Sequence, residues 1–190
     1  MVTRLEMPGW RGGRDLMTSH VFLDESKGRD YLLVAASVLS RDVAALRRAM
    51  RSHLRSGQRS IHFAKESDIT RAAVIATITR SQVAATVYRA PILRDELGAR
   101  EVCVRAAARD ARRADARLMV FDQDDSLLVH DRRWLFQELG PAGVRYEHQH
   151  RHGDPLLWIP DAVAWAWRRG GRWRLAVAGT VVREVDTARS

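Results

Sequence analysis

Two aspartates stand where two apolar strands are predicted to end. Asp24 follows the apolar run 20–23, and Asp122 follows the apolar run 118–121. In α/β folds, residues just beyond the ends of central strands converge on one edge of the sheet, where ligands bind. Two neighbouring carboxylates repel each other unless a cation neutralises them, so this pattern indicates a divalent-metal site.

A third acid, Asp161, lies in an apolar stretch beside Ile159 and Val163. An aspartate there is costly unless it is paired or bound to a metal. Each acid also has a purely structural interpretation. Asp161 could be a first-turn residue favoured by the helix dipole, and Asp24 and Asp122 could be turn formers or helix caps. Acids at two strand ends and on one helix match the ligand pattern of two-metal phosphoryl transferases, which work with Mg²⁺ or Mn²⁺.

The elements that must position these acids alternate between strands and helices, as in a layered α/β domain with a mixed sheet. We expect a loosely ordered leader over residues 1–18 and a single domain over residues 19–190. Ser40 is predicted to cap the first helix. Predicted strands are 20–23, 31–39, 83–92, 118–121, 144–150 and 175–185, a short extended piece is expected at 61–63, and predicted helices are 40–54, 64–79, 94–115, 126–139 and 156–169.

Four segments, in this order, resemble the bacterial family called domain of unknown function 3800. They are Phe22-Leu23-Asp24-Glu25-Ser26, the apolar run 31–39, Ile61-His62-Phe63, and the helix segment 156–165. The resemblance spans roughly residues 20–173. It implies an RNase H-like fold, with a mixed central β-sheet and helices on both faces, and metal-dependent nuclease chemistry.

The resemblance also assigns metal ligands and catalytic residues. Asp24 corresponds to the acid of the first strand, Asp122 to that of a middle strand, and Asp161 to that of the last helix. The family's His-then-acid segment corresponds to His62–Glu66, which makes Glu66 the fourth ligand. An RNase H pattern would instead take the fourth acid from the predicted helix 94–115, at Glu96 or Glu101.

The sequence departs from the family at two positions. Lys27 stands where a glycine is usual after Asp-Glu-Ser, and Pro160 stands where alanine is common before the helix aspartate. The lysine is less suited than a glycine to a tight turn after Asp-Glu-Ser, and the proline bears on the orientation of Asp161.

Several residues are predicted to support this site. Glu25 points away from Asp24 if the strand continues, and Ser26 completes the Asp-Glu-Ser motif. His62 orients a carboxylate or carries protons, against an equal alternative in which it is structural. Lys65 meets a phosphate or stays solvated, and either Asp124 or Asp125 caps the helix that starts near Ser126.

Three histidines alternate with polar residues at the end of the predicted strand 144–150. His148, His150 and His152 would share one strand face, but their spacing of about 6–7 Å is too wide for one ion. Contact with a substrate phosphate or simple exposure fits that spacing better than a metal site.

The chain carries a net charge of +9, and only two of its 32 basic residues are lysines. Arginine grips phosphate bidentately, so the excess is compatible with a polyanionic partner. A generally arginine-rich composition is the alternative. The predicted nucleic-acid contacts are Arg105, Arg109 and Arg112 on the long helix, and Trp173 between Arg172 and Arg174 as a stacking platform.

The single cysteine, Cys103, cannot form an intramolecular disulfide, which fits a reducing compartment. No stretch approaches the ~20 apolar residues needed to span a bilayer, and the first 19 residues lack the apolar run of a signal peptide. The sequence therefore predicts a cytoplasmic protein with no membrane partner.

We expect hydrolysis of nucleic-acid phosphodiester bonds with two Mg²⁺ or Mn²⁺ ions. Two other readings stay open. A non-catalytic nucleic-acid-binding or toxin–antitoxin (defence-type) interaction protein could retain the fold, and a transposase-like strand-transfer enzyme would suit the 39 positions from Asp122 to Asp161. The sequence leaves DNA or RNA, strandedness and oligomeric state open.

Overall fold

The computed structural model describes residues 18–92, 95–140 and 143–189. Apart from Thr18, the predicted leader lies outside these ranges. The described residues form a six-stranded sheet in the order β5-β4-β1-β2-β3-β6. The strands are β1 (Ser19–Ser26), β2 (Asp30–Leu39), β3 (Ala84–Pro91), β4 (Leu118–Asp122), β5 (Arg145–Gln149) and β6 (Val181–Asp186).

Parallel and antiparallel pairs are mixed in this sheet. β1 and β2 form an antiparallel hairpin, and β3 is antiparallel to β2. β4 runs parallel to β1, β5 parallel to β4, and β6 parallel to β3. The long apolar run of β2 is central, and its residues from Tyr31 to Ala36 are buried, as expected for a strand covered on both faces.

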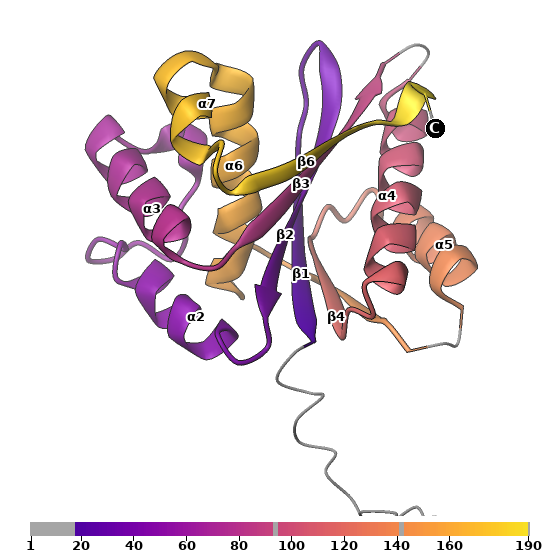
Figure 1. Cartoon of the computed structure of the whole chain (residues 1–190), viewed down its shortest axis with the longest axis horizontal. Coiled ribbons are helices and arrows are strands. Elements are labelled where there is room, and N and C mark those ends of the chain that lie inside the picture. The colour runs from indigo at the N-terminus through magenta and orange to yellow at the C-terminus, as the bar shows by residue number, and fades with distance from the viewer. Residues whose placement is uncertain (1–17, 93–94, 141–142, 190) are drawn as a thin grey trace, which may run out of the picture.

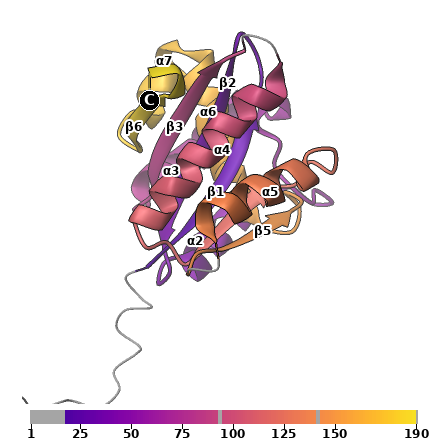
Figure 2. The ribbon, with the colours of Figure 1, turned by 90° about the vertical axis from the view of Figure 1, so that its right-hand side faces the viewer.

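Helices cover both faces of the sheet, as Figure 1 shows. On one face lie α2 (Val43–Arg51), α3 (Asp68–Arg80), α6 (Trp158–Arg169) and α7 (Gly171–Val177); α4 (Glu96–Arg113) and α5 (Leu128–Leu139) cover the other. Turned by 90°, the structure shows α4 and α5 packed side by side across their face (Figure 2). Three 3₁₀ turns complete the described elements: η1 (Phe63–Lys65), η2 (Pro155–Leu157) and η3 (Thr187–Arg189). The expected mixed sheet with helices on both faces is confirmed.

Side-chain alternation along β1 divides the core into two. Phe22 packs with the core beneath α2, α3 and α6, whereas Leu23 packs with the core beneath α4 and α5. Asp24 therefore faces α6, and Glu25 faces α4. This alternation decides which chemistry lies on which side of the sheet.

Several predicted boundaries are wrong by a few residues. Ser40 does not cap a helix: its hydroxyl donates to the carbonyl oxygen of Thr18, and α2 begins only at Val43. α3 begins at Asp68, because Ser67 caps it by accepting from the Thr70 amide. The extended piece expected at 61–63 runs into the 3₁₀ turn η1.

The expected strand over 175–185 is wrong in its first part, which is the helix α7. Gly170 and Gly171 have φ angles of 73° and 52°, a conformation that ends α6 and redirects the chain. Beyond them the side chains follow a helical pattern, with Val177 buried and Leu175 exposed. Only β6, at Val181–Asp186, is extended.

Candidate metal and nucleic-acid site

Three of the four predicted acidic ligands come together on the α6 side of the sheet. β1 and β4 are parallel, and their register ends with Leu23 beside Phe121, so Asp24 and Asp122 follow side by side. Asp161 lies in the first turn of α6, which packs against β1 and β2. The predicted strand end at Asp24 is wrong, because β1 continues to Ser26; the carboxylates come from within β1, from the last residue of β4 and from the first turn of α6.

A guanidinium lies at the point where these three carboxylates meet. Nη2 of Arg151 lies 2.5 Å from Asp122 Oδ2 and 3.5 Å from Asp24 Oδ2, and Nη1 lies 3.3 Å from Asp161 Oδ2. Arg151 follows β5, the strand next to β4 in the sheet. The acidic cluster, meaning Asp24, Asp122 and Asp161, is therefore neutralised in part by one internal cation.

Burial and mutual repulsion shape the electrostatics of the acidic cluster. Burial, together with the charges of Asp161 and Asp122, raises the pKa of Asp24 well above its usual range. Arg151 and a hydrogen bond from the Glu25 amide, 2.7 Å long, oppose that rise. Burial alone would lower the pKa of Arg151, but the three aspartates outweigh it and raise that pKa. One positive charge does not fully compensate three carboxylates.

The segment with η1 forms a second wall of the site. The Phe63 amide donates to Asp161 Oδ2 at 3.0 Å, which fixes the carboxylate from the side opposite α6. Nη1 of Arg151 lies 3.0 Å from Nδ1 of His62, and the same ring nitrogen lies 3.6 Å from Asp161 Oδ2. His62 thus contacts the cation of the acidic cluster.

Glu66 has other partners. Its side chain is 3% exposed, and its two oxygens accept from Gln58 at 2.6 Å and from Arg55 at 3.2 Å. The alternatives are also paired, Glu96 with Lys27 at 3.3 Å and Glu101 with Arg105 at 2.8 Å. The fourth ligand therefore stays a prediction, and Glu66 as placed serves a local ion pair.

The remaining supporting residues take varied places. Glu25 lies on the opposite side of the sheet, where it pairs with Arg100, as strand alternation predicts. Ser26 accepts from Arg168, and Lys65 is exposed in η1. Asp125 accepts from Gln123; it is the neighbouring Asp124 that caps the turn by accepting from the amide and hydroxyl of Ser126.

The predicted row of three histidines on one strand face is wrong, because β5 ends at Gln149. His150 and His152 lie in the following turn with rings stacked 5.4 Å apart. His148 lies instead against Phe121 and bonds Asp131 at 3.2 Å, on the α5 side.

The arginines predicted to bind nucleic acid lie on both sides of the sheet. Those on α4 reach toward α5: Arg105 and Arg109 pair with Glu138, and Arg112 bonds its backbone oxygen. On α7, Arg172 lies 4.7 Å over the ring of Trp173, and Arg174 lies 3.9 Å over Trp167. Only the α7 group is on the face that carries Asp161.

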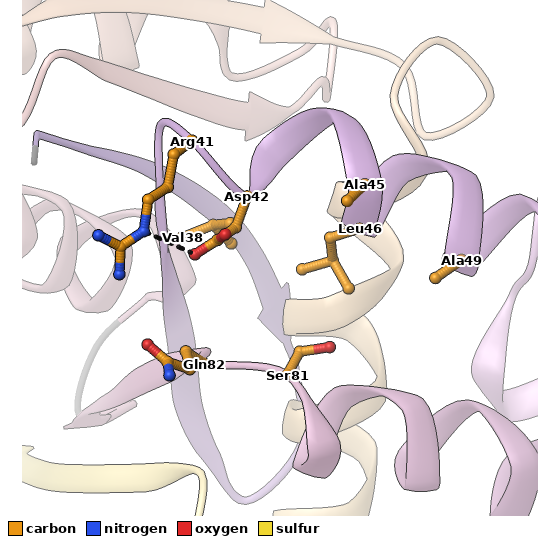
Figure 3. Close-up of a pocket in the computed structure, with 8 residues that line it drawn as sticks. All are labelled: Val38, Arg41, Asp42, Ala45, Leu46, Ala49, Ser81 and Gln82. Atoms are coloured by element: carbon orange, nitrogen blue, oxygen red, sulfur yellow. Dashed lines mark ion pairs between the residues drawn. The ribbon is translucent and has the colours of Figure 1, made fainter. Parts of the chain in front are cut away.

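A pocket elsewhere on this face contains none of the predicted site residues. It lies between the start of α2 and the end of α3, with Arg41 and Asp42 paired at 3.7 Å at its rim (Figure 3). Apolar and polar residues contribute equally to its lining, which consists of Val38, Arg41, Asp42, Ala45, Leu46, Ala49, Ser81 and Gln82. Its composition does not suit metal chemistry.

The sequence predictions missed Arg151. The feature of the sequence that points to Arg151 is its position, directly after a predicted strand and ten residues before Asp161. They also missed Asp131, which like Asp161 stands in a helix among apolar neighbours and is almost completely buried. The cost of burying an acid, applied to every helix, would have found it.

The donor chemistry of the acidic cluster fits Mg²⁺ or Mn²⁺, which prefer carboxylate oxygens. The distances between its carboxylates are those that accommodate the guanidinium of Arg151, which lies 2.5–3.5 Å from one oxygen of each aspartate. Within the described ranges, no three His, Cys, Asp or Glu side chains stand close enough together to hold a metal ion as placed. Asp24, Asp122 and Asp161 are the residues that would hold one.

No protein-family profile matches this chain, and no curated protein sequence matches it. Among the described residues, none of the helices combines the length and the apolar character that crossing a bilayer requires.

Solved structures do resemble it. The complex of PCNA with RNase HII from Archaeoglobus fulgidus matches with a TM-score of 0.56 and 18% identity, over 80% of this chain and 73% of that one. The crystal structure of Bst-RNase HIII with Mn²⁺ matches with a TM-score of 0.34 and 11% identity, over 88% of this chain and 60% of that one. The chain has an RNase H-like fold.

Proposed function

We propose that this protein is a metal-dependent nuclease that hydrolyses phosphodiester bonds of nucleic acid, as in the domain of unknown function 3800 family that its motifs resemble. The observation that carries the proposal is the convergence of Asp24, Asp122 and Asp161 from two neighbouring parallel strands and a helix start, on an RNase H-like sheet. Carboxylate oxygens are the ligands that Mg²⁺ and Mn²⁺ prefer, so binding such an ion is the catalytic role that suits these three side chains.

Bound divalent ions would supply charge neutralisation at the phosphate and an activated water. The chain's own residues hold this geometry. Asp24 is buried and fixed by the Glu25 amide, and Asp161 is fixed by the Phe63 amide. His62 reaches the same point from η1 with 43% of its side chain exposed, so it can meet a substrate.

A surface pocket between α3, α6 and α7 supports nucleic acid as the substrate. Trp165 lies one helical turn after Asp161, with the Arg71 guanidinium 4.5 Å above its ring and Trp173 in edge contact at 5.3 Å. Arg169 and Arg172 also line this pocket. Aromatic rings beside arginines suit stacked bases and backbone phosphates.

One observation favours a second candidate, a non-catalytic nucleic-acid-binding protein. Arg151 already supplies a positive charge to the acidic cluster, so the fold has a way to hold these aspartates without an ion. Calorimetry with Mn²⁺ separates the two functions, because the nuclease requires binding and the non-catalytic protein does not.

The direct test is cleavage of labelled DNA, RNA and hybrid substrates with Mn²⁺ or Mg²⁺. We expect Asp122→Asn and Asp161→Asn each to lower the rate by about 10²-fold or more, since each removes a charge from the metal site. Asp115→Asn, in the exposed turn that precedes β4, is the control and should cleave like the wild type, because asparagine tolerates the φ angle of 51° at this position. Unchanged cleavage by both site variants, or none by the wild type with any substrate, would refute the nuclease proposal.

A further inference from the structure

Arg151 is held in place by the backbone on either side of it. Its carbonyl oxygen accepts from the indole nitrogen of Trp158 at 2.7 Å, and Trp158 is almost fully buried. The Gly153 amide bonds the His150 carbonyl at 2.7 Å and closes the turn. The guanidinium therefore reaches the acidic cluster from an anchored turn.

The guanidinium and a divalent ion would need the same space. Arg151 contacts the three aspartates at nitrogen–oxygen distances of 2.5–3.5 Å. A bound Mg²⁺ requires oxygen atoms at about 2.0–2.1 Å, so the carboxylates must close in and the guanidinium must leave. An ion of charge +2 also compensates three carboxylates better than the single charge of arginine.

The side chain of Arg151 has a way out. It is 28% exposed, and its place in a turn leaves the four-bond side chain free to swing while the backbone stays anchored. The guanidinium contacts His62, whose side chain is 43% exposed, and the residues on either side of Arg151 in the chain, His150 and His152, are exposed. Displacement moves a charge toward solvent, which lowers its desolvation cost.

We infer that Arg151 is an exchangeable counter-ion: it competes with a divalent cation for Asp24, Asp122 and Asp161, and after displacement its guanidinium binds a phosphate of the substrate. This inference rests on the proposed function. Arg151 then has two states. Without metal its guanidinium holds the three aspartates together, and with metal bound the guanidinium positions the nucleic acid.

The test is Mn²⁺ binding without substrate, measured by calorimetry at fixed pH and low ionic strength. We expect Arg151→Met to bind Mn²⁺ about tenfold tighter than the wild type, or more, since its internal competitor is gone. The control is Arg113→Met, which removes an arginine paired with Asp110 on the opposite face of the sheet and should match the wild type. Should R151M fail to fold, Arg151→Gln removes the charge and keeps hydrogen-bond donors.

Cleavage at saturating Mn²⁺ gives the second measurement. R151M should cleave about tenfold more slowly or worse, and Arg151→Lys should recover part of that loss, because a lysine still offers a positive charge to phosphate. Tighter metal binding together with slower cleavage is the signature, since mere structural damage would weaken both.

Equal or weaker Mn²⁺ binding by R151M than by the wild type overturns the inference and leaves the nuclease proposal standing. Unchanged cleavage by R151M overturns the phosphate-binding part. Absence of Mn²⁺ binding by both proteins overturns the proposed function together with the inference.

Discussion

Two arginine–carboxylate clusters lie back to back across β1, and they differ in how completely each arginine is enclosed. Arg151 serves the acidic cluster on the α6 side, next to Asp24. Arg100 serves the other side, next to Glu25, together with Asp131. The side chain of Arg100 is 2% exposed, whereas that of Arg151 is 28% exposed.

The Arg100 cluster is saturated. Arg100 bonds Asp131 through two nitrogens, at 2.8 Å and 2.7 Å, and it also contacts Glu25 and the Tyr31 hydroxyl. His148 adds a further bond to Asp131. Burial would raise the pKa of Asp131, but the bonds from Arg100 and His148 outweigh it and keep that pKa below its usual range.

The acidic cluster is not saturated. Three carboxylates share one guanidinium, and the pKa of Asp24 is raised rather than lowered. The same residue types therefore give two outcomes: a closed network that fixes β1 against α4 and α5, and an open one that can exchange its cation. Enclosure and charge balance, not residue type, decide which is which.

The comparison is tested most strongly by removing each arginine in turn. Arg100→Met should lower the free energy of unfolding by about 3–5 kcal/mol, because it leaves Asp131 buried without its cation. Arg151→Met in metal-free protein should cost less, about 1–3 kcal/mol, since Asp122 and Asp161 are each 14% exposed and the buried Asp24 can take up a proton. Urea denaturation of both variants measures the difference, and equal losses would contradict it.

Next in size is the effect of neutralising one aspartate in each cluster, which should have opposite signs. Asp131→Asn should lower stability at pH 7 by about 2 kcal/mol, because it removes charge-assisted bonds to Arg100. Asp24→Asn should raise stability without metal by on the order of 1 kcal/mol, because it removes a buried charge and keeps an oxygen for the Glu25 amide.

The pH dependence of these two effects also differs. For Asp24 the raised pKa means that the folded state holds its proton longer, so the wild type loses stability as pH rises from 3.8 through the folded pKa. The gain from D24N should therefore fade on acidification. For Asp131 the lowered pKa gives stability that is present above 3.8 and is lost as pH falls through the folded pKa. Melting curves from pH 2 to pH 8 cover both trends, and parallel curves would refute the contrast.

The smallest effect tests the periphery of the saturated cluster. Tyr31→Phe removes a hydroxyl that accepts from Arg100 at 2.8 Å and donates to Glu25 at 3.3 Å. We expect a loss of about 0.5–1.5 kcal/mol, because the arginine keeps its other partners. Urea denaturation measures this loss. A loss as large as that of R100M would show that the Tyr31 hydroxyl matters as much to the cluster as the arginine itself.

Much of the fold followed from local patterns. The apolar runs of β1, β2 and β4 and the helices α4 and α5 were predicted nearly in place, because hydrophobic periodicity reports burial directly. α7 was missed, since a helix of seven residues that begins at Gly171 carries too little periodicity to be identified. The same reasoning found Asp24, Asp122 and Asp161 but not the arginine that they contact.

The sequence by itself determined that Asp24 and Glu25 lie on opposite sides of the sheet, because side chains alternate along a strand. It also predicted that Asp24 and Asp122 meet, whereas Glu66, predicted with them, bonds Gln58 and Arg55 in the structure. Only the tertiary structure decided what faces them. Arg151 and Arg100 lie 127 and 75 positions from the acids of β1 that they contact. A long side chain has no periodic signature, so its partner depends on how distant turns and helices pack.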